Sequence, residues 1–190
     1  MREATYYVAV SLDGYIADPT GNWSAFPMEG DHMQALMTEF TDTIPGHVQR
    51  LVGIEADRSR FDTVLMGWRT YTPALDDGID SPYPHLRQVV ASSQERTLPD
   101  EIEQTTDPLG TLRALKAEDG GSGIYVAGGG ALASAVEPEL DRLILKVNPI
   151  TLGDGIPLFA PRSGPAVAWT RLQSRPFESG VVLNEYVRAA

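Results

Sequence analysis

Three consecutive glycines, Gly128, Gly129 and Gly130, are the residues of this sequence best suited to holding an anion. They follow a short apolar run at residues 124–127 and precede small and apolar residues at helical spacing, which continue until Pro138. A strand, a glycine turn and a helix direct unpaired backbone N–H groups and the helix dipole toward a phosphate. We interpret the turn as the pyrophosphate site of a dinucleotide cofactor, and a tight connection without a ligand is the alternative.

A second unit of the same kind lies at residues 61–71. Its apolar run ends at Gly67, and Arg69 and Thr70 open a short helix. This order places a guanidinium and a hydroxyl beside free backbone N–H groups, which again suits a phosphate.

A third group of phosphate-binding types follows the short strand predicted at residues 88–91. It contains Ser92, Ser93 and Arg96. Two serines and an arginine after a strand suit a phosphate monoester, and a serine-rich turn is the alternative interpretation.

Asp13 is the first candidate for proton chemistry, because it stands beside Gly14 at the end of the strand predicted at residues 5–10. Its carboxylate can accept from N–H or hydroxyl groups of a ligand, or it can cap the turn.

Two further carboxylates, Glu29 and Asp31, and one imidazole, His32, stand where a helix is predicted to begin. The helix dipole favours carboxylates there in any case, and for His32 a capping or solvated role competes with an acid–base role. The apolar stripe of this helix is Met33, Leu36, Met37, Phe40 and Ile44. A short second helix is predicted at residues 47–53, with Val48, Leu51 and Val52 inward.

Composition limits the function classes. The 190 residues are 42% hydrophobic and 22% charged, which is typical of one globular domain, here residues 1–190. The absence of cysteine excludes disulfides, thiolate catalysis and cysteine-ligated zinc, and we predict no metal site. A net charge of −11 repels nucleic acid and anionic lipid, so we expect neither as a partner. The N-terminus lacks the apolar core of a signal peptide and no segment suits a membrane span, which predicts a cytoplasmic protein.

Strands alternate with helices along most of the chain, which predicts a largely parallel sheet with ligands at its carboxyl edge. Asp107 and Pro108 are cap and first-turn signals for the helix that precedes the triple glycine. Two longer strands at residues 166–174 and 180–188 then form an antiparallel hairpin that closes the sheet.

The triple-glycine segment also matches the dinucleotide fingerprint G-x-G-x-x-G/A, but it lies too late in the chain for the first turn of a Rossmann domain. The order of motifs instead resembles the dihydrofolate reductase fold, and most closely the family named for the C-terminal domain of the bifunctional riboflavin-biosynthesis deaminase–reductase. The motifs are SLDGYIA (11–17), MGWRTY (66–71), VVASSQ (89–94), YVAGGG (125–130) and PITLGDGIPLF (149–159). The implied architecture is a single-domain α/β fold, with a mostly parallel mixed sheet flanked by helices and a C-terminal antiparallel hairpin.

The resemblance implies that NADPH is the cofactor and that hydride passes to a flat heterocycle or its attached sugar. It places the cofactor phosphates on Gly67, Arg69 and Thr70 and the pyrophosphate on residues 128–132. The residues implied for the pyrophosphate are Gly128, Gly129, Gly130, Ala131 and Leu132. It also implies a cis peptide between Gly128 and Gly129.

By the same resemblance, Ser92, Ser93 and Arg96 meet the adenosine 2′-phosphate, and Asp13 lies near the nicotinamide. Trp68 departs from the family pattern, because relatives often carry arginine there, and this bears on the choice of NADPH over NADH. Asp13, with Glu29 or Asp31 in reserve, is the candidate to orient the substrate or relay a proton.

The substrate implied first is the family's namesake, 5-amino-6-(5-phosphoribosylamino)uracil. Dihydrofolate or another pterin is the competing substrate, and a nucleotide-binding module without catalysis is the competing class. The resemblance also implies a homodimer.

Overall fold

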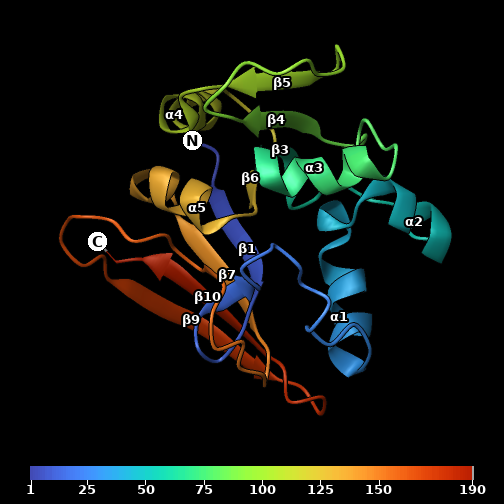
Figure 1. The fold of residues 1–190 in the computed structure, drawn as a ribbon, viewed down its shortest axis with the longest axis vertical. Helices are drawn as coiled ribbons and strands as arrows, with labels where there is room; N and C mark the ends of the chain where they lie inside the picture. The colour runs from blue at the N-terminus through green and yellow to red at the C-terminus, as the bar shows by residue number, and fades with distance from the viewer. Residues whose placement is uncertain (190) are drawn as a thin grey trace.

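A computed structural model describes residues 1–189, and its centre is one eight-stranded sheet (Figure 1). The strands are β1 (Ala4–Val10), β3 (Phe61–Gly67), β4 (Arg87–Ala91), β5 (Ile102–Thr105), β6 (Gly123–Ala127), β7 (Arg142–Val147), β9 (Trp169–Pro176) and β10 (Val182–Arg188). Their order is β5-β4-β3-β6-β1-β7-β10-β9. Neighbours from β5 to β7 are parallel, while β10 is antiparallel to both β7 and β9.

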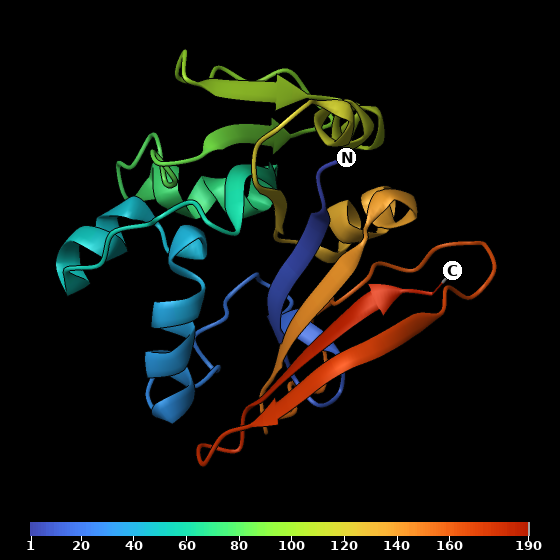
Figure 2. The same ribbon diagram turned by 180° about the vertical axis from the view of Figure 1, so that it is seen from behind.

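Helices cover both faces of the sheet. Helices α1 (Asp31–Glu39) and α3 (Trp68–Asp76) pack on one face, around a core that includes Tyr7, Phe40 and Tyr125. Helices α4 (Pro108–Ala117) and α5 (Gly130–Val136) pack on the other, around Leu65 and Val126. The two views show this division and the C-terminal hairpin at one side of the sheet (Figures 1 and 2). The predicted architecture is therefore confirmed.

Adjacent residues of β1 show why the central strands are apolar without alternation. Tyr6 and Tyr7 point to opposite faces, and each is buried in a different core cluster. A strand covered on both faces carries apolar residues at successive positions and not only at alternate ones, which is the pattern expected of a parallel sheet. Because the strands from β5 to β7 run the same way, their carboxyl ends share one edge.

The remaining elements are short. They are β2 (Tyr15–Ala17) and β8 (Ile156–Pro157), which pair with each other, α2 (Gly46–Val52) and the 3-10 turns Thr41–Thr43 and Glu137–Glu139. Strands β5 and β8 were not predicted from sequence. None of the described helices has the length and apolarity needed to cross a membrane.

Helices α1 and α2 differ from the predicted patterns. Helix α1 ends at Glu39, so Ile44 lies outside it, and its buried face is formed by His32 and Leu36. In α2 the prediction of inward Leu51 and Val52 is wrong, because these side chains are 84% and 43% exposed. The side chain of Gln49 turns inward instead and donates to the carbonyl of Ile44 at 2.7 Å. The orientation of α2 therefore follows the hydrogen bond made by the buried Gln49 side chain and not the hydrophobic periodicity of the sequence.

Candidate active site

The two glycine turns lie side by side because β3 and β6 are neighbours in the sheet, with Met66 opposite Ala127. The backbone of Gly128 packs directly on the side chain of Thr70, which leaves no room for a Cβ atom at this glycine. The hydroxyl of Thr70 also accepts a hydrogen bond from the backbone N–H of Gly129 at 3.4 Å. The turns therefore form one continuous surface at the carboxyl edge.

The three consecutive glycines have different roles. Gly128 has a φ of +98° and packs on Thr70, while a Cβ atom at Gly130 would collide with the carbonyl oxygen of Pro157. Both are therefore required by packing. Around Gly129, by contrast, no heavy atom lies within 4 Å of the place a Cβ would take. Gly129 is the glycine that leaves room for an incoming group.

The predicted cis peptide between Gly128 and Gly129 is wrong, because the peptide bonds of residues 1–189 are all trans. The chain turns here through the left-handed conformation of Gly128, which only glycine adopts readily.

Helices α3 and α5 begin without a side-chain cap. Their N-cap residues are Gly67 and Gly129, neither of which can offer a side-chain acceptor. Helix α4 is the contrast, because the carboxylate of Asp107 accepts from the backbone N–H of Gly110 at 3.0 Å. The first-turn N–H groups of α3 and α5 belong to Trp68, Arg69, Thr70, Gly130, Ala131 and Leu132. These donors have no partner within their helices and favour an anion at this edge.

The end of β4 adds a cation to this surface. The guanidinium carbon of Arg96 lies 4.5 Å from the centroid of the Trp68 ring, and its Nε donates to the hydroxyl of Ser92 at 3.4 Å. Ser92 is buried and donates to the carbonyl of Gln94 at 2.8 Å, so its hydroxyl stabilises the turn. Ser93 and Arg96 are exposed. The structure thus brings Trp68 and Arg96 together, and it leaves Ser93 and Arg96 accessible to a phosphate.

Asp13 lies at the end of β1, where its carboxylate anchors another loop. It accepts from the hydroxyl of Ser11 at 2.5 Å and from the backbone N–H groups of Leu152 at 3.0 Å and Gly153 at 2.7 Å. These hydrogen bonds lower the pKa of Asp13, and the bond from Ser11 contributes most, with the bond from Gly153 second. Because these bonds favour the charged form, the carboxylate is better suited to holding a loop than to donating a proton.

The acidic residues near α1 serve different neighbours. The carboxylate of Asp31 accepts from the backbone N–H groups of Glu178 at 2.8 Å and Ser179 at 3.1 Å, in the turn between β9 and β10. Figure 2 shows the start of α1 beside the tip of this hairpin. His32 is buried, with Nδ1 2.9 Å from the hydroxyl of Ser179, so a solvated role for it is wrong. Glu29 is exposed.

Lys146 on β7 was not predicted as a site residue. Its Nζ lies 4.5 Å from the centroid of the Tyr7 ring, and no hydrogen-bond or ion-pair partner reaches it within residues 1–189. Burial lowers its pKa from 10.5 to about 8. The available signal was a lysine inside the apolar run LILKV of a predicted strand.

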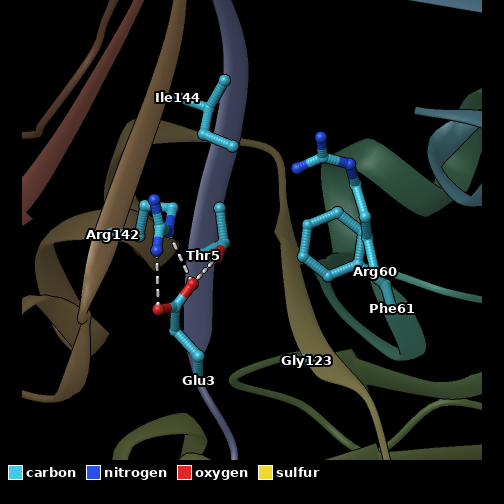
Figure 3. Close-up of a pocket in the computed structure, with 7 residues that line it drawn as sticks. All are labelled: Glu3, Thr5, Arg60, Phe61, Gly123, Arg142 and Ile144. Atoms are coloured by element: carbon cyan, nitrogen blue, oxygen red, sulfur yellow. Dashed lines mark hydrogen bonds and ion pairs between the residues drawn. The ribbon is translucent and has the colours of Figure 1, made fainter. Parts of the chain in front are cut away.

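The amino-terminal edge of the sheet holds a hollow of about 270 Å³ (Figure 3). Glu3 and Arg60 lie on opposite walls of this hollow. The carboxylate of Glu3 forms a bidentate ion pair with Arg142, with hydrogen bonds of 2.6 and 3.0 Å. No predicted site residue lines it. We therefore assign the candidate active site to the carboxyl edge, where the glycine turns, Arg96 and Asp13 lie.

The eight-stranded, mostly parallel sheet, covered by helices on both faces and completed by the antiparallel hairpin of β9 and β10, makes this an α/β protein of the dihydrofolate reductase-like class. Comparison with solved structures supports this fold. A putative riboflavin biosynthesis protein from Shewanella sp. PV-4 superposes with a TM-score of 0.67 at 23% identity, over 99% of both chains. A second solved structure superposes with a TM-score of 0.64 at 16% identity, over 99% of this chain and 57% of that one. It is a diaminohydroxyphosphoribosylaminopyrimidine deaminase/5-amino-6-(5-phosphoribosylamino)uracil reductase from Thermotoga maritima.

The sequence comparison identifies the family. The model of the RibD C-terminal domain matches residues 3–183, and the chain belongs to this family. An uncharacterized protein of Bacillus subtilis (strain 168), YwjB, is 30% identical over an alignment of 170 residues, and the match covers 83% of this chain and 83% of that protein. The predicted resemblance to the riboflavin-biosynthesis reductase family is confirmed.

Proposed function

We propose that this protein is an NADPH-dependent reductase acting on a pyrimidine- or pterin-type heterocycle. The observation that carries the proposal is the packing of Thr70 against Gly128 and Gly129, because it joins two uncapped helix starts into one anion-binding surface. Membership of the RibD C-terminal domain family supports a reductase.

The residues at this edge fit a dinucleotide phosphate. The open space beside Gly129 and the free first-turn N–H groups of α3 and α5 suit a diphosphate. Arg69 is exposed at the start of α3, and Arg96 and Ser93 are accessible to the 2′-phosphate that distinguishes NADPH from NADH. When bound, NADPH supplies the hydride.

The protein's own contribution is then to bind and orient. Asp13 connects the end of β1 to the segment around Leu152 and Gly153, and we propose that it positions this segment beside the substrate. Glu29 and Asp31 are both exposed, but Asp31 already accepts two backbone hydrogen bonds, so we propose Glu29 as the carboxylate for proton transfer.

The first substrate to test is 5-amino-6-(5-phosphoribosylamino)uracil, because the Thermotoga maritima protein, which has the same fold, is named as a reductase of this compound. NADPH consumption would be followed with this compound and, in parallel, with dihydrofolate. Consumption with either supports the reductase and selects the substrate type. Saturable NADPH binding without turnover on either would replace the proposal with a nucleotide-binding module.

Binding to the proposed surface is tested with a matched pair of variants at the open glycine. Gly129→Asp places a negative charge where the diphosphate is expected, and Gly129→Ala adds only a methyl group to free space. We expect Gly129→Asp to weaken NADPH binding by more than about 100-fold and Gly129→Ala by less than about tenfold. Both variants would be checked for folding by circular dichroism. Equal NADPH affinity in the two would contradict a diphosphate site at this edge.

A further inference from the structure

Four side chains form a continuous stack on the α1 face of the sheet. The rings of Phe40 and Tyr7 are stacked, with centroids 4.6 Å apart and planes 11° from parallel. Arg60 lies 4.5 Å from the centroid of Phe40, and Nζ of Lys146 lies 4.5 Å from that of Tyr7. Because the two rings occupy each other's inner faces, the cations lie on the outer faces. Lys146 thus ends the stack on the side of Tyr7 away from Phe40.

The strand register places Lys146 at the same edge as the candidate active site. It is the penultimate residue of β7 and pairs with Ala9, the penultimate residue of β1. Asp13 and its loop follow directly from β1, and β6 with its glycine turn flanks β1 on the other side.

Among residues 1–189 no carboxylate pairs with the ammonium of Lys146, although the full sequence contains 26 acidic residues. Its register partners Ala9 and Leu183 are uncharged. Around Tyr7 the charged groups are Arg60, Glu39 and Arg175, and the carboxylate of Glu39 already takes two hydrogen bonds from Arg175, at 2.7 and 3.1 Å.

Lys146 nevertheless reaches the surface. Its side chain is half-buried, and among residues 1–189 the enclosed side-chain polar atom without a partner is Nε of Arg175, not Nζ of Lys146. A small ligand can therefore approach the amine. The other lysine, Lys116, shows the contrast, because its Nζ donates to the carbonyl of Glu139 at 2.8 Å and to Asp141 at 2.9 Å.

We propose that Nζ of Lys146 binds an anionic oxygen, of a phosphate or a carboxylate, on a small ligand at the carboxyl ends of β1 and β7. A half-buried cation without a counter-ion gains a charge-assisted hydrogen bond when such an oxygen arrives. If the proposed reductase function holds, this ligand is the substrate, and Lys146 selects for an anionic group on it. The oxyanion site itself does not require nicotinamide binding.

The sequence offers a direct measurement, because Lys116 and Lys146 are its only lysines. Lysine labelled with carbon-13 beside the amine therefore gives two signals in the intact protein. Inorganic phosphate, ribose 5-phosphate and orotate would each be titrated at constant ionic strength in sodium chloride. We expect at least one of them to shift the Lys146 signal saturably and to raise its pKa by about one unit, with Lys116 unmoved.

A response to the two phosphates alone identifies a phosphate site, and a response to orotate alone identifies a carboxylate site. A Lys146 signal that none of the three compounds moves would overturn the proposal.

Two variants complete the test. Lys146→Met keeps most of the aliphatic stem without the charge, and Lys146→Arg keeps the charge. By calorimetry we expect Lys146→Met to lose at least about tenfold in affinity for the responding compound and Lys146→Arg to stay within about threefold of the wild type. Unchanged affinity in a folded Lys146→Met variant would also overturn the proposal. Failure of the wild-type protein to bind NADPH would remove the proposed reductase function and leave the lysine titration standing.

Discussion

The hydroxyl oxygen of Thr70 lies 3.4 Å from the backbone nitrogen of Gly129, so a hydrogen bond joins the first turn of α3 to the turn before α5. The two residues are 59 positions apart in the chain. The contact fixes the two uncapped helix starts relative to one another, which is the arrangement that the proposed anion site requires before a ligand binds.

Stability should separate two adjacent glycines at this contact. Gly128→Ala forces a Cβ against Thr70 at a φ of +98°, and we expect it to lower the free energy of unfolding by about 2 kcal/mol or more. The methyl group of Gly129→Ala would occupy open space, so this variant should change the free energy of unfolding by less than about 1 kcal/mol. Urea denaturation of the two variants measures the difference. Equal stabilities would contradict the packing described for Gly128.

The stacking of Arg96 on Trp68 predicts cofactor selectivity. Arg96→Gln removes the accessible cation beside Ser93, and we expect NADPH affinity to fall about tenfold while NADH affinity stays within about twofold. Arg113→Gln is the matched control, because Arg113 pairs with Glu139 on the surface at 2.8 Å. Titration of both cofactors into each variant decides the matter, and a parallel loss of NADPH and NADH affinity would argue against a 2′-phosphate contact.

The three hydrogen bonds to Asp13 predict a split between binding and turnover. Asp13→Asn replaces one of the two accepting oxygens with an NH2 group and removes the negative charge, so we expect the hydrogen bonds from Leu152 and Gly153 to weaken and the segment to be held less firmly. NADPH affinity should stay within about twofold while kcat with the responding substrate falls about tenfold or more. Steady-state kinetics beside cofactor titration gives both values. Turnover equal to that of the wild type would dismiss a role for Asp13.

The half-buried amine of Lys146 predicts a pH dependence of stability. Burial lowers its pKa from 10.5 to about 8, so the folded state binds fewer protons than the unfolded state between these values. Stability should therefore rise with pH across this window, relative to a Lys146→Met variant that lacks the group. Below pH 8 the variant should be the more stable protein, by at most about 3 kcal/mol. Denaturation at pH 7 and pH 9.5 measures this difference, and a pH-independent difference would contradict the assignment.

Local patterns in the sequence were sufficient for the two strand–glycine–helix units and the Asp107 cap of α4. Each depends on residues within a few positions of one another, where spacing and backbone preference decide the structure. The alternation of strands and helices also predicted the parallel sheet and hence the edge at which Gly67, Ser93 and Gly129 all lie.

Contacts between distant segments decided the remainder. The sequence alone could not show that Gly128 and Gly130 are packed while Gly129 is open, because Thr70 and Pro157 approach from other parts of the chain. The tertiary structure likewise enclosed His32 beside Ser179 and bound Asp13 to the Leu152 segment, and it left Lys146 without a counter-ion from the part of the chain that the structure describes. Residue types and spacing determine which groups can do chemistry, whereas packing across the sheet determines which of them remain free to do it.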